Sequence, residues 1–362
     1  MKFQSRAVKL FASFIVLILF VAGLHAQTGK IIREKLHSRS LEKTVTGESA
    51  DRNLSIYLPP SYETSTEKRY PVIYLLHGIG DTDETFLRPW SDKNPGFATV
   101  QEVMNSGIGA GKFGEMIVVM PDEKTNWFGS FYVNSTVTGN WEDFTVHELV
   151  EYMDGKYRTL ANPKNRGIAG HSMGGYGALT LSMKHPEVFS AAYAMNPAII
   201  DWGGDLTIES PALEFVLGAK SYDDLLKTGD LYKMGVITLA QAFSPNPQKP
   251  PFFVDLPFKK VNGRMVPDEP GFTRWREHSP IRMVVKYRDN LQKLSGIRFD
   301  SGYSDEFQFI PVNCRAFSSE LTNNGIDHRF EEYNGDHRNR LWGEKGRFYN
   351  EVVPFFWTLL KN

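Results

Sequence analysis

Cysteine is nearly absent from this sequence, because Cys314 is the single cysteine among 362 residues. One thiol cannot form an intramolecular disulfide or a zinc site with several cysteine ligands, and its position excludes a lipid anchor on an N-terminal cysteine. A surplus of one charge is also absent, since 41 Lys and Arg residues face 42 Asp and Glu residues. Without excess positive charge to neutralise a phosphate backbone, we expect no nucleic-acid partner. Hydrophobic residues make up 41% of the chain, so its stability must come from packing.

The first 26 residues have the pattern of a secretory signal peptide. Positive residues precede an apolar run over 10–24, and small residues follow it up to Ala26. We therefore expect a cleavable signal over 1–26, a single mature domain over 27–362, and a secreted or periplasmic protein; an uncleaved N-terminal anchor is the alternative. No second apolar run has the length of a membrane span, so we expect no integral membrane partner.

Strand-like and helix-like patterns alternate along the rest of the chain, which predicts an α/β architecture with helices on both faces of a mostly parallel sheet. Short apolar runs bounded by Gly, Pro or Asp are typical of buried parallel strands. The alternation fails over about 196–286, where the proline-dense 244–253 segment cannot be one helix, so we expect a cap-like insertion there. The expected strands are 52–58, 72–76, 116–120, 166–169, 189–194, 297–299 and 328–333, and the expected helices are 142–160, 173–185, 312–324 and 346–360.

A nucleophilic serine is predicted at Ser172. It lies in Gly170-His-Ser-Met-Gly174, between a predicted strand and a helix rich in small residues. A sharp strand-to-helix turn exposes the hydroxyl group in this pattern, and glycines on either side leave room for neighbouring backbone. The N–H of Met173, in the first turn of the helix, is placed to bind a developing oxyanion. The alternative is a tight glycine-rich turn with an incidental serine.

A second oxyanion donor is predicted in the loop after the strand 72–76. That strand ends in His77-Gly-Ile79-Gly, the form of the loop that supplies the other backbone N–H in α/β-hydrolases, and we assign the donor to Ile79. For His77 we favour a role in holding this loop over a catalytic one.

The serine needs a general base and an acid to orient it, both later in the chain. His337 follows the last predicted strand, where a loop can present it over the sheet edge, whereas His185, His278 and His328 lie at a helix end, in the insertion and at a strand start. For the acid, Asp305 follows a predicted strand, with Asp300 as the reserve.

These motifs, in the order HGIG, GHSMGG, GYSDEF and GDHRNRLW, resemble the esterase D superfamily of α/β-hydrolases, which includes feruloyl and acetyl xylan esterases. The resemblance implies Ser172 as nucleophile, Asp305 as acid and His337 as base, with the N–H groups of Ile79 and Met173 as the oxyanion hole. It also implies neither a metal nor an organic cofactor. The sequence differs from the usual pattern of this family at two places near the expected substrate position. One is an acidic loop at Asp81, Asp83 and Glu84, and the other is Arg338, directly after the base.

The expected secretion of the protein and a cluster of aromatic residues indicate the class of substrate. Trp127, Phe128, Phe131 and Tyr132 follow the strand 116–120 at its carboxyl end, where α/β sheets bind ligands, and we expect Trp127 and Tyr132 to contact substrate. His171 is a further candidate. Trp202, Trp275 and Phe252 in the insertion either stack on a substrate ring or pack the cap.

The predicted function is therefore that of a secreted serine esterase acting on feruloyl or acetyl esters, with acylated plant polysaccharide or a small ester as its partner. The alternatives are a siderophore esterase of the enterobactin type, another short-acyl esterase, or a non-catalytic binding protein on the same fold.

Overall fold

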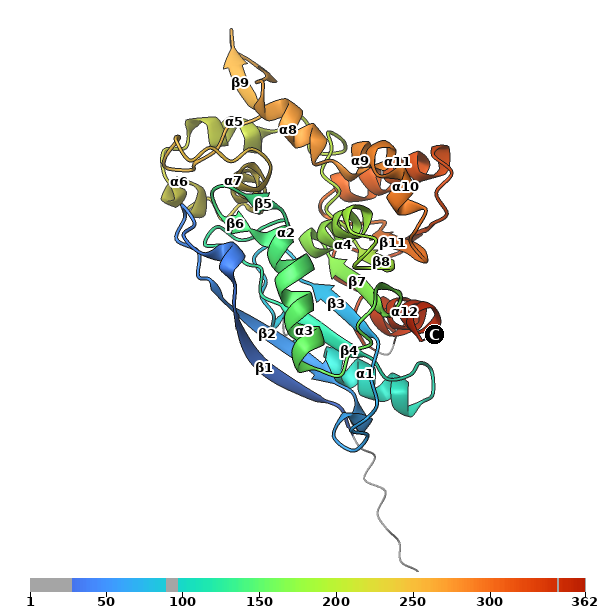
Figure 1. Ribbon diagram of the computed structural model, residues 1–362. Coiled ribbons are helices and arrows are strands. Elements are labelled where there is room, and N and C mark those ends of the chain that lie inside the picture. Colours follow the sequence, from blue (N-terminus) through green and yellow to red (C-terminus); the bar gives the residue numbers. More distant parts are fainter. Residues whose placement is uncertain (1–27, 89–96, 344, 362) are drawn as a thin grey trace, which may run out of the picture.

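The computed structural model describes residues 28–88, 97–343 and 345–361. At its centre is an eight-stranded sheet with the spatial order β1-β2-β4-β3-β7-β8-β11-β12 (Figure 1). The first three strands pair antiparallel to one another, and all later pairs from β4 to β12 are parallel. The strands are β1 (Lys30–His37), β2 (Asp51–Leu58), β3 (Val72–Leu76), β4 (Ile117–Pro121), β7 (Arg166–His171), β8 (Ala191–Met195), β11 (Gly296–Gly302) and β12 (Arg329–Tyr333).

Each face of the sheet is covered by its own set of helices. Along β3, Tyr74 packs into a cluster with the first set, and its neighbour Leu75 packs into another with the second set, because successive side chains of a strand point to opposite faces. Both faces of the central strands are therefore buried, as parallel strands require. The first set is α3 (Leu149–Lys156), α4 (Met173–Lys184) and α11 (Phe309–Asn323), and the second is α1 (Val100–Gly109) and α12 (Val353–Leu360).

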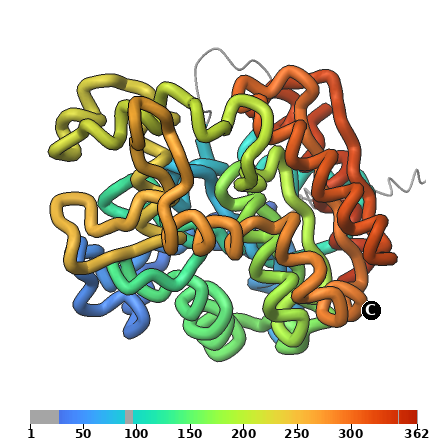
Figure 2. The backbone as a smooth tube through the Cα atoms, turned by 90° about the horizontal axis from the view of Figure 1, so that it is seen from above, coloured from blue at the N-terminus to red at the C-terminus, as the bar shows by residue number. Residues whose placement is uncertain are grey.

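Between β8 and β11 the chain builds the cap, which we define as residues 196–291. It lies above the sheet in Figure 1 and in front of it in Figure 2. The proline-dense segment after α7 contains no helix, as its composition predicts. The cap contains α5 (Pro211–Gly218), α6 (Tyr222–Leu226), α7 (Leu231–Phe243), β9 (Phe258–Val261), β10 (Arg264–Pro267), α8 (Gly271–Glu277), α9 (Pro280–Lys286) and α10 (Arg288–Leu291).

Several elements differ from their sequence-based bounds. The predicted helix 142–160 is divided into α2 (Trp141–Asp143), a π-helical turn and α3, and the last predicted helix begins with a second π-helical turn before α12. The edge strand β1 was not predicted, because its alternating charged residues suit a strand with one exposed face better than a buried one. The smaller elements are β5 (Asn134–Ser135), β6 (Gly139–Asn140), the π-helical turns Phe144–Glu148 and Phe348–Val352, and the 3-10 turns Arg39–Leu41, Pro60–Tyr62, Thr85–Leu87 and Pro163–Asn165.

The predicted signal peptide over 1–26 lies outside the described residues. Within the described ranges, no helix combines the length and the apolar character that crossing a membrane requires.

Candidate active site

Ser172 lies at the sharp turn between β7 and α4. Its backbone has φ 57° and ψ −117°, a conformation that costs energy for a residue with a Cβ. The flanking glycines make the turn possible: a Cβ on Gly170 would lie 2.2 Å from the carbonyl of Gly174, and a Cβ on Gly174 would lie 2.1 Å from the carbonyl oxygen of Leu76. The N–H of Ser172 donates to Met195 O at 3.0 Å, which ties the turn to the neighbouring strand. The G-x-S-x-G spacing thus has a steric cause.

His337 and Asp305 meet in the loops that follow β12 and β11. The Nδ1 atom of His337 lies 2.7 Å from Oδ2 of Asp305, and the two side chains are 3% and 0% exposed. Because the carboxylate accepts, Nδ1 carries the proton and Nε2 is left for another partner. Oδ1 of Asp305 accepts the backbone N–H of Phe307 at 2.8 Å, which fixes the carboxylate.

Burial governs the ionisation of this pair. It lowers the pKa of His337 below its ordinary value, so the imidazole is neutral at pH 7. It also raises the pKa of Asp305, an effect that the N–H of Phe307 opposes. A neutral imidazole is the protonation state that a general base requires.

Asp300, the reserve candidate for the acid, belongs to a different network. Its Oδ2 atom lies 2.7 Å from Nε of Arg347 and accepts the hydroxyl of Tyr193 at 2.8 Å. The side chain is fully buried within β11, and Arg347 leads into the C-terminal helix. Asp300 therefore ties that helix to the sheet, and Asp305 is the carboxylate that contacts His337.

Two buried residues donate hydrogen bonds to the backbone of His337. Its carbonyl oxygen accepts Nε2–H of His171 at 2.7 Å and Nδ2–H of Asn196 at 3.0 Å. Asn196 also accepts the N–H of Gly302 at 2.6 Å, so it links the β11 end to the His337 loop. The role of Asn196 could not be predicted, because its partners are more than 100 residues away.

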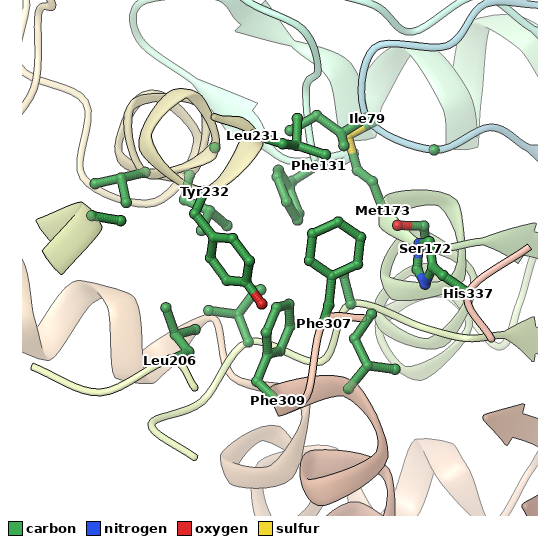
Figure 3. Close-up of a pocket in the computed structure, with 18 of the residues that line it drawn as sticks. Ile79, Phe131, Ser172, Met173, Leu206, Leu231, Tyr232, Phe307, Phe309 and His337 are labelled. Atoms are coloured by element: carbon green, nitrogen blue, oxygen red, sulfur yellow. The ribbon is translucent and has the colours of Figure 1, made fainter. Parts of the chain in front are cut away.

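The loop after β3 brings Ile79 to the same place. The N–H of Gly80 donates to Phe128 O at 2.8 Å, and no hydrogen bond from the N–H of Ile79 occurs within the described part of the chain. The N–H of Met173 belongs to the first turn of α4, where a helix offers no internal acceptor. Ile79 and Met173 line one pocket with Ser172 and His337 (Figure 3).

His77 holds the Ile79 loop, the role favoured from the sequence. Its Nε2 atom accepts the N–H of Glu123 at 2.8 Å, so Nδ1 is the protonated nitrogen and donates to Gly78 O at 2.8 Å. Burial lowers the pKa of His77 and keeps the ring neutral. Both ring nitrogens are therefore occupied by backbone groups.

A pocket lined mostly by apolar side chains extends from Ser172 under the cap. In Figure 3, Ser172 and His337 lie at one end, and aromatic and aliphatic side chains line the rest. The cap contributes an apolar wall of Leu206, Leu213, Leu231, Tyr232, Val236 and Leu239. The loops of the sheet contribute Phe131, Phe307 and Phe309. In the described ranges, no group of three or more His, Cys, Asp or Glu side chains could hold a metal ion.

The predicted substrate contacts at Trp127 and Tyr132 need correction, because neither residue lines the pocket. The indole N–H of Trp127 donates to Met234 O at 3.0 Å, and the Tyr132 hydroxyl donates to His77 O at 2.8 Å. Positive φ angles at Phe128, Phe131 and Tyr132 redirect the side chains of this turn, so Phe131 faces the pocket. His171 does line the pocket, although its Nε2 atom is used by His337.

The aromatic residues of the cap pack against one another. Trp202 contacts Phe272 and Trp275, with ring centroids 5.5 and 6.0 Å away and nearly parallel planes. Trp275 is 2% exposed and donates its indole N–H to Ser244, and Phe252 contacts Tyr222 edge-on. These rings therefore pack within the cap, which is one of the two roles expected for them from the sequence.

A family model described as "Putative esterase" matches residues 48–345. The chain belongs to this esterase family. The predicted resemblance to an esterase family and the α/β-hydrolase fold are therefore confirmed. An esterase of Mycobacterium tuberculosis is 28% identical over 214 residues, which cover 54% of this chain and 43% of that protein.

Two further curated relatives are enzymes with different names. An endo-1,4-beta-xylanase/feruloyl esterase of Xylanibacter ruminicola is 29% identical over 42% of this chain and 21% of its own length. An S-formylglutathione hydrolase of Arabidopsis thaliana is 31% identical over 41% of this chain and 54% of its own length. This chain thus spans less than half of the length of the first curated relatives that it matches.

Solved structures share the fold over nearly the whole chain. A ferulic acid esterase superimposes with a TM-score of 0.62 at 22% identity, covering 92% of this chain and 99% of that one. An S-formylglutathione hydrolase from Agrobacterium tumefaciens gives a TM-score of 0.57 at 15% identity, with 92% and 97% covered. At these identities the likeness shows the architecture alone.

Proposed function

We propose that this protein is a serine carboxylesterase in which Ser172 is the nucleophile, His337 the general base and Asp305 the residue that orients the base. The observation that carries the proposal is the buried Asp305–His337 hydrogen bond in the pocket that also contains the strained turn at Ser172. In this mechanism His337 takes the proton of the Ser172 hydroxyl as its oxygen attacks the ester carbonyl. The proton then passes to the alcohol oxygen as the ester bond breaks, and water repeats the sequence to release the acid.

The N–H groups of Ile79 and Met173 act as the oxyanion hole in this proposal. Ile79 belongs to the loop after β3 and Met173 to the first turn of α4, and both residues line the pocket beside Ser172. Donors that are already in place when the tetrahedral intermediate forms lower its energy without reorganisation. The hydrogen bonds from Gly80 to Phe128 and from Tyr132 to His77 give the Ile79 loop the necessary rigidity.

Feruloyl esters of plant polysaccharide are the substrates that we infer. Phe131, Phe307, Phe309 and Tyr232 give the pocket aromatic walls, which suit a phenylpropenoyl group better than an acetyl group. The relatives named as feruloyl esterases support this choice. The signal-like pattern over 1–26 supports a secreted or periplasmic location, where such a polymer is found.

The proposal is tested by initial rates of the purified protein on methyl ferulate, acetylated xylan, p-nitrophenyl acetate and a siderophore lactone. We expect the highest kcat/KM on methyl ferulate. Ser172→Ala should lose activity by about 10⁶ with an unchanged melting temperature, because the nucleophile is removed from a preserved fold. Ser319→Ala, an exposed serine on α11, is the matched control.

A labelling experiment separates catalysis from binding. An active-serine phosphonate should modify the wild-type protein and Ser319→Ala, and it should leave Ser172→Ala unlabelled. Absence of label on the wild-type protein would favour the non-catalytic binding protein. A dominant rate on the siderophore lactone would replace the feruloyl substrate but keep the mechanism.

A further inference from the structure

The pocket has two chemically different parts. Its larger part is apolar and lies between the cap and the two phenylalanines that follow Asp305. Two charged residues, Asp81 and Arg338, also line the pocket, and each follows a residue of the site: Asp81 comes two positions after Ile79, and Arg338 comes directly after His337. Opposite charges therefore flank the reacting groups on the two loops that lie outside the cap.

The Asp81 carboxylate lies close to the nucleophile. Its Oδ2 atom is 3.1 Å from the point where a Cβ on Gly78 would stand, and the Cβ atom of Ser172 is 3.4 Å from the same point. Burial raises the pKa of the Asp81 carboxyl group, and the positive charge of Arg338 is among the effects that oppose this rise.

Arg338 has a fixed backbone and an accessible guanidinium group. Its N–H donates to Oδ1 of Asp336 at 2.8 Å, and its side chain is 55% exposed. The carboxylate paired with it belongs to Glu306, whose Oε1 atom is 3.9 Å away, beyond hydrogen-bond distance. The planar donors of Arg338 are therefore available to a ligand in the pocket mouth.

We propose that Asp81 and Arg338 form the alcohol subsite and recognise a leaving group rich in hydroxyls, such as a sugar. The inference rests on the proposed function, because His337 must reach the alcohol oxygen to protonate it, and Arg338 is the next residue. An apolar acyl group occupies the part under the cap, which leaves the alcohol beside the two charged side chains. A carboxylate accepts and a guanidinium donates, so together they match the hydroxyls of a sugar.

The test compares two esters with the same acyl group, methyl ferulate and 5-O-feruloyl arabinose. The wild-type protein should have the higher kcat/KM on the sugar ester. Asp81→Asn and Arg338→Gln should each reduce the sugar-to-methyl ratio about tenfold, the size expected for the loss of one charge-assisted hydrogen bond. Arg338→Lys should give an intermediate ratio, because it keeps the charge and loses the planar fork.

Matched controls carry the same change in charge outside the pocket lining. Glu84→Gln belongs to the same loop as Asp81, and Arg340→Gln follows Arg338 by two residues. Both controls should keep the wild-type ratio. An unchanged ratio in Asp81→Asn and Arg338→Gln, with both esters still cleaved, would overturn the alcohol subsite, whereas failure of the wild-type protein to cleave either ester would overturn the proposed function itself.

Discussion

The edge of the sheet and the cap contribute to the pocket in opposite ways. The loops after β3, β7, β11 and β12 bring polar groups into it, among them Ser172, Asp81 and His337. The cap contributes a wall in which Tyr232 and Ser210 are the polar side chains and the others are apolar or glycine. The polar groups thus come from strand ends, and the helical insertion adds a mostly apolar wall to the aromatic residues that the sheet loops supply.

This difference indicates that the sheet edge and the cap should control different properties of the enzyme. Side chains at strand ends are placed by the sheet, whose register allows little movement, so they can hold a precise geometry. The cap rests on the sheet loops through contacts such as the Thr238 hydroxyl on Trp127 O at 3.1 Å and the Ser135 hydroxyl on Gln241 O at 2.6 Å. Changes at the sheet edge should therefore alter turnover, and changes in the cap should alter the choice of acyl group.

The sharpest test of the sheet edge is Asp305→Asn. The amide cannot stabilise an imidazolium and favours the wrong tautomer of His337, so kcat should fall by about 10⁴ with little change in KM. Steady-state kinetics on methyl ferulate measures this effect.

Asp300→Asn is the matched control, five residues earlier in the chain. It breaks a buried ion pair with Arg347, so the unfolding free energy should fall by about 3 kcal/mol while kcat in the folded enzyme is retained. If Asp300→Asn lowered kcat more than Asp305→Asn, the assignment of the two carboxylates would be reversed.

The cap is tested by filling its part of the pocket. Val236 is 3% exposed on α7 and faces the cavity, so Val236→Phe should reduce kcat/KM on methyl ferulate by about 10- to 100-fold through steric exclusion. The rate on p-nitrophenyl acetate should change much less, because a short acyl group does not reach α7. Val285→Phe, at a 64% exposed position on α9, makes the same change outside the pocket and should affect neither substrate. Equal losses on both esters would show that the cap also supports the reacting groups.

The sheet edge and the pocket walls also differ in how well the sequence predicts them. The turn at Ser172 was predictable because glycines, a serine and a strand-to-helix boundary must coincide within five residues for steric reasons. Asp305 and His337 were singled out by chain order and by their positions after strands, and the structure brings the two side chains into contact. These are local signals, and the sheet topology brings them together.

The walls of the pocket could not be predicted in this way. Tyr232 faces the cavity because α7 docks on loops more than 100 residues away, and no local pattern records that contact. In the turn over 125–133, positive φ angles turn Phe131 toward the pocket, whereas the Tyr132 hydroxyl donates to His77 O. Phe307 and Phe309 stand just after Asp305, which is the one signal that could have identified them.

The smallest expected effect concerns how the sheet loops are held. Glu123 is fully buried beneath the turn that carries Phe131, and its carboxyl group accepts the hydroxyls of Thr145 and Ser130. Burial raises the pKa of Glu123 to about 8, from an ordinary value of 4.5. Between these two values the folded protein holds a proton that the unfolded chain releases.

Folding therefore takes up one proton in this range, and the unfolding free energy should decrease as pH rises, by as much as about 1.4 kcal/mol per pH unit from this group alone. Glu123→Gln replaces the carboxyl group by a neutral amide, so the slope between about pH 5.5 and 7.5 should become less negative by about that amount. Urea denaturation at several pH values measures both slopes, with Glu151→Gln on the exposed side of α3 as the control. If the slope of Glu123→Gln equalled that of the wild-type protein, the Glu123 carboxyl group would be ionised in the folded state. The hydroxyls of Thr145 and Ser130 would then donate to a carboxylate and not to a protonated carboxyl group.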